Sequence, residues 1–157
     1  MDQTWGMGRN SARAAVKAVA MLVASSVVAH ANSLVTDDTT QNGGEYQADT
    51  PVLRITGSSN PTLTLDNAAT VNWNGAPSSA TVVGLDDGES GSLQVLNGST
   101  LTNAGNGSPT LNTFNGQSIL SGYAYLGFLA NSNGSATISG QDSRWENFVL
   151  NVGYNGT

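Results

Sequence analysis

Apolar and polar residues alternate in short stretches from Pro51 onward, and small polar residues interrupt each stretch. Val52, Leu53 and Ile55 open the pattern, and Leu93 and Val95 continue it with one polar residue between them. Side chains of a β-strand point to opposite faces in turn, so residues two apart share a face. The Gly, Asn, Ser and Pro residues between the stretches are typical of turns. The pattern therefore predicts many short strands over residues 51–157 and an all-β fold.

Two series of similar segments recur within this region. In the first, residues 63–71 (LTLDNAATV) match residues 93–101 (LQVLNGSTL), and residues 115–119 (NGQSI) form a shorter copy. In the second, an apolar residue and Gly precede a strand that begins with Gly, at 83–95 and again at 126–138. Val152-Gly153 starts that series once more. No single unit has enough apolar residues for a core, so the units must stack and share one.

Two architectures fit one unit taken alone. Asn-Gly between alternating apolar residues is a strong signal for an antiparallel hairpin, and on local evidence hairpin and solenoid are equally good. Repetition of the same unit favours parallel stacking, because identical positions then superpose one strand spacing apart, about 4.8 Å. We therefore predict a β-solenoid whose shared core includes residues from successive units: Leu93, Val95, Leu101, Ile138, Trp145 and Val152.

Residues 1–31 have the layout of a secretory signal peptide. Basic residues precede an apolar run from Ala18 to Val28, which is expected to be helical, and small residues at Ala29 and Ala31 fit the signal peptidase. We predict cleavage after Ala31 and export from the cell. The apolar run is shorter than the roughly 20 residues of a membrane-spanning helix, so no stable span is expected after cleavage.

Composition changes across the remaining chain. Residues 32–50 are polar and acidic without sustained periodicity, which favours a flexible leader or a cap, and residues 51–157 form the solenoid region. Beyond residue 31, ten acidic residues face only two basic ones, Arg54 and Arg144. Such a charge balance repels phosphate, so nucleic acid is not an expected partner.

The residues available for catalysis or for cofactors are few. The chain has no Cys, and its single histidine, His30, lies in the predicted signal peptide. We therefore predict no enzyme activity and no cofactor or metal. The acidic cluster Asp86-Asp87-Gly88-Glu89 lacks the ligand spacing of known calcium loops, which favours a solvated corner over a calcium site.

Glycan chemistry gives the alternative function. Hydrolysis of a glycosidic bond needs two carboxyl groups on either side of it, and Asp66, Asp142 and Glu146 lie in different units of the sequence. Trp73 and Trp145 could stack on sugar rings, but each lies where the pattern expects a residue facing the stack, so packing is favoured.

The segment 134–147 (GSATISGQDSRWEN), followed by 150–156 (LNVGYNG), resembles a repeat of bacterial autotransporter (type V secretion) passenger domains and of some PEP-CTERM-sorted proteins. Residues 83–103 are a degenerate copy with Leu101 at the Trp position, and from about Leu63 onward the resemblance is one of general texture. The resemblance implies a right-handed parallel β-helix outside the cell, a handedness that agrees with the rule for parallel crossovers.

The resemblance also sets the expected function and location. It implies a stalk or adhesin at the bacterial cell surface, in the outer membrane or outside the cell, whose partners are a host-cell or glycan surface or neighbouring cells. The solenoid is expected to be incomplete, because the sequence stops inside a repeat at Thr157. A secreted polysaccharide-active β-helix enzyme is the alternative.

Overall fold

The computed structural model describes residues 33–73, 75–105, 107, 109–114 and 116–155, and these ranges contain strands and turns but no helix. The predicted signal peptide, with Ala29 and Ala31 at its cleavage site, lies outside the described residues. The prediction of an all-β fold is confirmed for the part of the chain that the structure describes.

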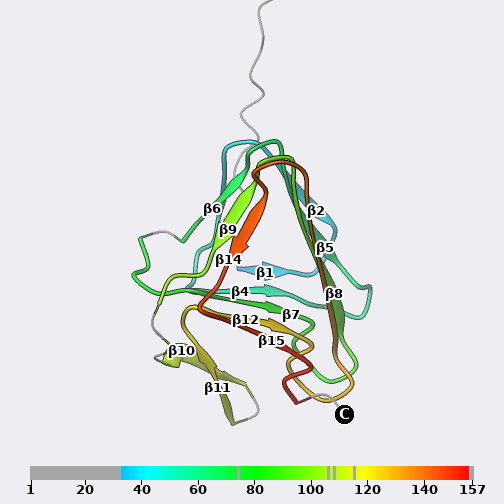
Figure 1. Ribbon diagram of the computed structural model, residues 1–157. Helices are drawn as coiled ribbons and strands as arrows, with labels where there is room; N and C mark the ends of the chain where they lie inside the picture. Colours follow the sequence, from blue (N-terminus) through cyan, green and yellow to red (C-terminus); the bar gives the residue numbers. More distant parts are fainter. Residues whose placement is uncertain (1–32, 74, 106, 108, 115, 156–157) are drawn as a thin grey trace, which may run out of the picture.

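Three parallel sheets contain most of the strands, and the chain visits them in turn (Figure 1). Sheet A has the order β1 (Leu34–Val35), β4 (Val52–Ile55), β7 (Ala80–Val83), β12 (Tyr123–Leu126) and β15 (Val149–Val152). Sheet B has the order β2 (Thr39–Asn42), β5 (Thr62–Asp66), β8 (Ser90–Leu96) and β13 (Asn133–Ser139). Sheet C has the order β3 (Glu45–Gln47), β6 (Thr70–Asn72), β9 (Thr100–Thr102) and β14 (Arg144–Glu146).

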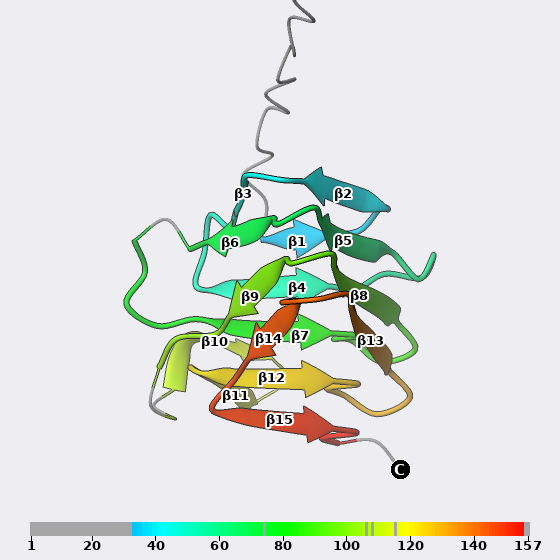
Figure 2. The same cartoon turned by 45° about the horizontal axis from the view of Figure 1, so that its top comes forward.

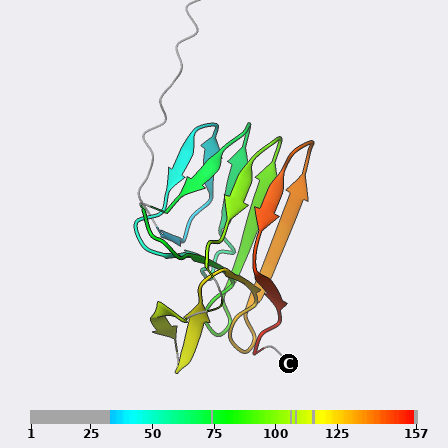
Figure 3. The same cartoon turned by 60° about the vertical axis from the view of Figure 1, so that its left-hand side comes forward.

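Each passage of the chain through the three sheets forms one coil. The first coil is β1–β3, the second β4–β6, the third β7–β9 and the fourth β12–β14, and β15 follows the fourth. Figure 2 shows the strands of sheet A stacked from β1 to β15, and Figure 3 shows the strands of sheets B and C side by side. The pairing within sheets A, B and C is parallel, as predicted, and the arrangement is consistent with a β-helix-like fold.

Inward-facing side chains stack in register from coil to coil. Gln41, Leu65, Val95 and Ile138 form one such column in sheet B. In sheet A the corresponding column consists of Val35, Ile55, Val83, Leu126 and Val152. Because the same position recurs in each coil, short units that could not form a core alone share a continuous one.

The predicted core residues differ in burial according to their coil. Three of them are buried, namely Leu93, Val95 and Leu101. Trp145 is partly buried and packs against the same core. Ile138 and Val152 face the interior by register, yet they are 45% and 72% exposed. Both lie in the last strands of their sheets, where no described coil covers them.

The glycines of the second repeat series lie at one recurring corner after sheet A. Gly84, Gly127 and Gly153 have φ values of 69°, 69° and 67°. This left-handed conformation is strained for most residues and free of strain for Gly. The equivalent corner between sheets B and C uses Asn67 and Asn97, with φ values of 54° and 48°.

The sequence left open whether the segment before residue 51 is a flexible leader or a cap. Residues 33–50 form β1, β2 and β3, which pair with the strands of the second coil. Their inward-facing side chains are buried, with exposures of 2% for Val35, 6% for Gln41 and 1% for Tyr46. Gln41 Nε2 donates to Gly43 O at 2.6 Å, which satisfies one polar group of this inward-facing amide. These strands were not predicted because most residues of the segment are polar.

One insertion interrupts the coils between β9 and β12. It contains the antiparallel pair β10 (Pro109–Phe114) and β11 (Gln117–Leu120). The segment 115–119 was interpreted as a short copy of the repeat, but its residues 117–119 belong to β11 and pair antiparallel instead of joining a parallel sheet. Ile119 of β11 joins a second apolar cluster on the outer side of sheet A: Val52, Ala80, Val82, Leu85, Tyr125, Phe128 and Leu129.

Candidate functional site

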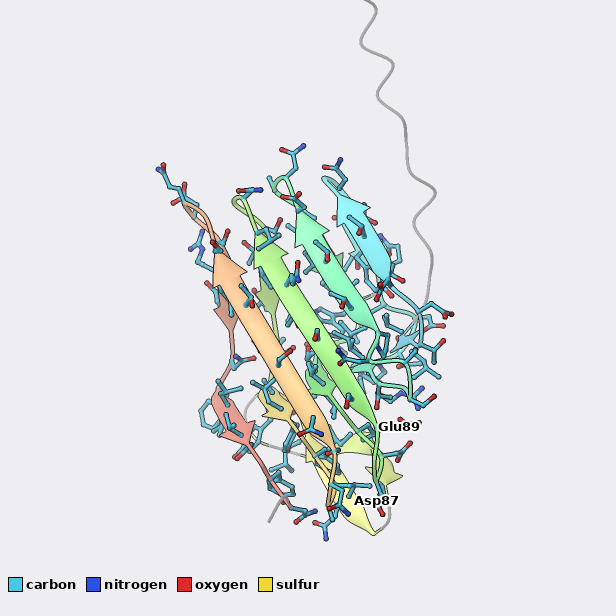
Figure 4. The ribbon with its side chains drawn as sticks, turned by 90° about the vertical axis from the view of Figure 1, so that its right-hand side faces the viewer. Asp87 and Glu89 are labelled. Atoms are coloured by element: carbon cyan, nitrogen blue, oxygen red, sulfur yellow. The ribbon has the colours of Figure 1, made fainter. Side chains whose placement is uncertain are left out.

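The outer face of sheet B presents a surface of small polar side chains (Figure 4). We call this surface the polar face and define it by six outward-facing residues: Thr62, Thr64, Ser92, Gln94, Ser135 and Thr137. They alternate with the inward-facing column residues, and none of the six is charged. The Ser92 and Ser135 hydroxyls are hydrogen-bonded at 2.8 Å, so the face is linked from coil to coil.

A recess of about 310 Å³ lies at the corner where the chain leaves sheet A and enters sheet B. We call it the corner recess, and its polar lining residues are Thr36, Arg54, Thr56, Ser58, Ser59, Asp86 and Glu89. Thr56 is 3% exposed, and its hydroxyl connects two segments that line the recess. Its Oγ1 donates to Glu89 Oε2 at 2.7 Å and accepts from the Leu85 amide at 2.8 Å.

The electrostatics of the corner recess combine both signs of charge. The pKa of Asp86 is raised from its ordinary value because the carboxyl is partly buried and because Glu89 is close. Arg54 acts in the opposite direction and favours the ionised carboxyl. The recess therefore offers a cation, two carboxyl groups and several hydroxyls, which are groups that hydrogen-bond a polar ligand.

A second recess of about 410 Å³ adjoins the start of β8 and β13. It is lined by Asn60, Ser90, Gly91, Asn133, Gly134 and Ser135. Two backbone hydrogen bonds join Gly57 and Ser90, and residues next to this bridge line the two recesses. Since Ser135 also belongs to the polar face, the polar surface continues from the corner onto sheet B.

The acidic cluster is spread over separate partners. Asp87 Oδ1 accepts from Asn131 Nδ2 at 2.9 Å, whereas Glu89 is held by Thr56. Figure 4 shows Asp87 and Glu89 near the start of β8. Among the described residues, no group of three or more His, Asp or Glu side chains could hold a metal ion.

The carboxyl groups considered for glycan hydrolysis do not converge. Asp66 Oδ1 accepts from Asn97 Nδ2 at 2.8 Å at the corner between sheets B and C. Glu146 accepts from Thr102 at 3.1 Å on sheet C and pairs with Arg144 at 3.8 Å. The carboxyl groups of Asp66 and Glu146 thus lie in structural contacts between or within coils.

The two tryptophans among the described residues pack against the core. Trp73 and Trp145 are partly buried and contact the central cluster. Trp73 Nε1 also donates to the Thr102 carbonyl of the next coil at 2.8 Å. The sequence analysis did not predict that Arg54 and Thr56 line a recess. The one signal for such a site was the arginine within an otherwise apolar strand.

No family model, curated protein or solved structure matches the chain. Among the described residues, no helix has both the length and the apolar character needed to cross a membrane. The functional argument therefore depends on the surface itself.

Replacing Thr56 with Val is expected to lower the free energy of unfolding by about 1–3 kcal/mol. The substitution keeps the shape of the side chain but leaves the buried Leu85 amide and Glu89 without their partner. Denaturant unfolding followed by circular dichroism measures the loss. Thr56→Ser is the control, because it keeps the hydroxyl; equal losses for both variants would contradict the assigned role of Oγ1.

Proposed function

We propose that the chain is a segment of an exported bacterial surface protein, similar to an autotransporter passenger domain, in which a right-handed parallel β-helix acts as a stalk or adhesin. The parallel coils with constant register support a rigid rod, because each coil adds one strand spacing of about 4.8 Å to its length. The repeat at 134–153 supports the assignment to such passengers. The predicted signal peptide supports export to the cell surface, the outer membrane or the medium.

The observation that carries the adhesive role is the polar face of sheet B. Its hydroxyl and amide groups stand at regular positions along the coils, and the corner recess extends them with charged groups. Hydroxyl and amide side chains both donate and accept hydrogen bonds, so this surface suits the many hydroxyls of a glycan. The proposed partner is therefore a glycan-bearing surface of a host cell or of a neighbouring cell.

Adhesion is tested on the chain expressed with its own first 31 residues in a bacterium that has an outer membrane. We expect a mature protein that begins at Asn32, and binding of that protein to glycans on an array and to glycan-bearing cells. Thr137→Arg, which places a long charged side chain on the polar face, is expected to reduce this binding at least about tenfold. The matched control is Thr70→Arg on sheet C, since both threonines are exposed and outward-facing.

Two results would contradict the adhesin. One is a folded, exported protein that binds no glycan or cell. The other is an equal loss of glycan binding in Thr137→Arg and Thr70→Arg. Retention of the first 31 residues in the mature protein would contradict the proposed signal cleavage instead.

One observation favours the alternative of a polysaccharide-active enzyme. Asp86 and Glu89 share the corner recess, and the raised pKa of Asp86 is the kind of shift found in a carboxylic acid that donates a proton. Glycoside hydrolysis uses one such acid and a second carboxylate. Turnover of any member of a polysaccharide panel, lost in Asp86→Asn and Glu89→Gln, would favour this alternative over the adhesin.

A further inference from the structure

The corner recess and the second recess follow each other directly along the chain. Glu89, near the start of β8 in Figure 4, lines the corner recess, and Ser90 lines the second. Ser59 and Asn60 are divided between the two recesses in the same way. Gly57 and Ser90 are joined by two backbone hydrogen bonds of 3.0 and 3.1 Å where the recesses meet. We call the two recesses together the recess track.

Three stacked coils form the corner recess. Thr36 follows β1 of the first coil, Thr56 and Ser58 follow β4 of the second, and Asp86 and Glu89 follow β7 of the third. The corner recess is therefore formed without β13, β14 and β15, the last strands of their sheets. Because the Thr56 hydroxyl bonds Glu89 at 2.7 Å, this part of the lining is fixed before a ligand arrives, which reduces the entropy lost on binding.

The size and polarity of the recess track suit a chain of sugars. Its two recesses have volumes of about 310 and 410 Å³, each within the range of small-molecule sites. Such sites are usually apolar, whereas most of the residues that line this track have hydroxyl, amide or charged side chains. A ligand that fills both recesses must be elongated and must carry many hydrogen-bonding groups, as an oligosaccharide does.

The charges of the corner recess distinguish between kinds of oligosaccharide. Asp86 and Glu89 supply two carboxyl groups, and Arg54 supplies one guanidinium group. Ionised carboxyl groups accept hydrogen bonds from hydroxyl groups that are stronger than those between neutral groups. An acidic sugar would instead meet two like charges for one opposite charge, on a chain with ten acidic and two basic residues beyond residue 31. The recess therefore favours uncharged over acidic sugars.

We propose that the recess track binds one extended, uncharged oligosaccharide, with a sugar at one end in the corner recess and the following sugars in the second recess. This inference rests on the proposed glycan-binding function, and it names the site and the class of the glycan. The sugars are linked covalently, so binding in one recess raises the effective concentration of sugar at the other. Ser135 lines the second recess and belongs to the polar face, so a longer chain continues onto sheet B.

The test measures the affinity of the mature protein for linear oligosaccharides by titration calorimetry. The probes are the uncharged cellulose and chitin series and the acidic mannuronate series, each from the disaccharide to the hexasaccharide. The affinity for an uncharged series is expected to rise at least about tenfold with length and to level off once both recesses are filled. Mannuronate oligomers are expected to bind at least about tenfold more weakly than uncharged oligomers of equal length.

Asp86→Asn tests the corner recess and is expected to weaken the binding of every uncharged oligomer by about tenfold, because a carboxylate acceptor is replaced by a neutral amide. The matched control is Asp87→Asn, which changes the charge equally at the neighbouring position. Asp87 lines neither recess, and asparagine keeps an oxygen for the contact with Asn131. An equal loss for the two variants would contradict binding in the corner recess.

Asn133→Arg tests the second recess, because it places a long side chain in it. It is expected to remove the gain of affinity with chain length and to leave the affinity for the disaccharide unchanged. Ser139→Arg is the control, since Ser139 is exposed at the other end of β13 and lines neither recess. Circular dichroism verifies that all variants are folded.

Failure of this inference and failure of the proposed function give different results. Glycan binding that is lost in Thr137→Arg but depends neither on chain length nor on Asp86 would overturn the recess track and leave the adhesin standing. A folded protein that binds no glycan would overturn both. Tighter binding of mannuronate, or of deacetylated chitin oligomers over chitin oligomers, would overturn the assignment of an uncharged ligand.

Discussion

Replacing Gly91 with Ala is expected to lower the free energy of unfolding by at least about 3 kcal/mol, at the upper end of the cost of overpacking. A Cβ atom at this position would lie 2.0 Å from the Ile55 carbonyl oxygen. That oxygen accepts a hydrogen bond from the Gly84 amide at 2.9 Å, so it cannot move aside without breaking the corner of the coil. Denaturant unfolding followed by circular dichroism measures the loss, which is a large share of the stability of an ordinary domain.

The same contact recurs one coil later, which explains why the repeat begins with glycine. Gly134 pairs in register with Gly91, and a Cβ on Gly134 would lie 2.2 Å from the Val83 carbonyl oxygen. Val83 is in turn the register partner of Ile55. The glycine near the start of β8 and of β13 is thus required by the close approach of the neighbouring coil.

Gly57→Ala is the matched control for Gly91→Ala. Gly57 lies at the same corner, its φ is not positive, and the nearest atom to an added Cβ is a Pro61 side-chain carbon at 3.4 Å. Its effect is expected to stay within about 1 kcal/mol. If Gly91→Ala were as stable as Gly57→Ala, the close packing of coils at this corner would be contradicted.

The sequence was sufficient to predict the elements whose side chains alternate between a buried and an exposed face. Leu93 and Val95 on β8 are separated by outward-facing Gln94, so the period of two was visible. Periodicity failed at β7, where all four residues are buried because the second apolar cluster covers the outer side of sheet A. In a strand buried on both faces, polar residues do not alternate with apolar ones, so the sequence does not show which side faces the core.

The corner recess could not be predicted from the sequence because its parts come from different coils. Thr56 and Glu89 are 33 residues apart and meet only when the second and third coils are in register. The number of residues in each connection sets that register, and the connections differ in length. The acidic cluster is evident in the sequence as consecutive residues. The contact of Glu89 with Thr56 is not, because it joins two different coils.

The difference in burial between coils also could not be predicted from the sequence, for a related reason. Ile138 and Leu65 occupy one column and would be assigned the same burial from their alternation with polar neighbours. Their burial differs because Leu65 has a coil on either side, whereas Ile138 has a described coil on one side only. In a stacked fold, the environment of a residue thus depends on its coil as much as on its place in the repeat.

Leu65→Ala is accordingly expected to lower the free energy of unfolding by about 3 kcal/mol, within the range found for cavities in closed cores. Leu65 is 0% exposed and lies between Gln41 of the first coil and Val95 of the third. Both neighbours are held by backbone ladders, so they cannot collapse fully into the space. Ile138→Ala, in the same column, removes a side chain that is 45% exposed and is expected to cost less than about 1 kcal/mol. Equilibrium unfolding of both variants makes the comparison, and similar losses would contradict the different burial of these two residues in one column.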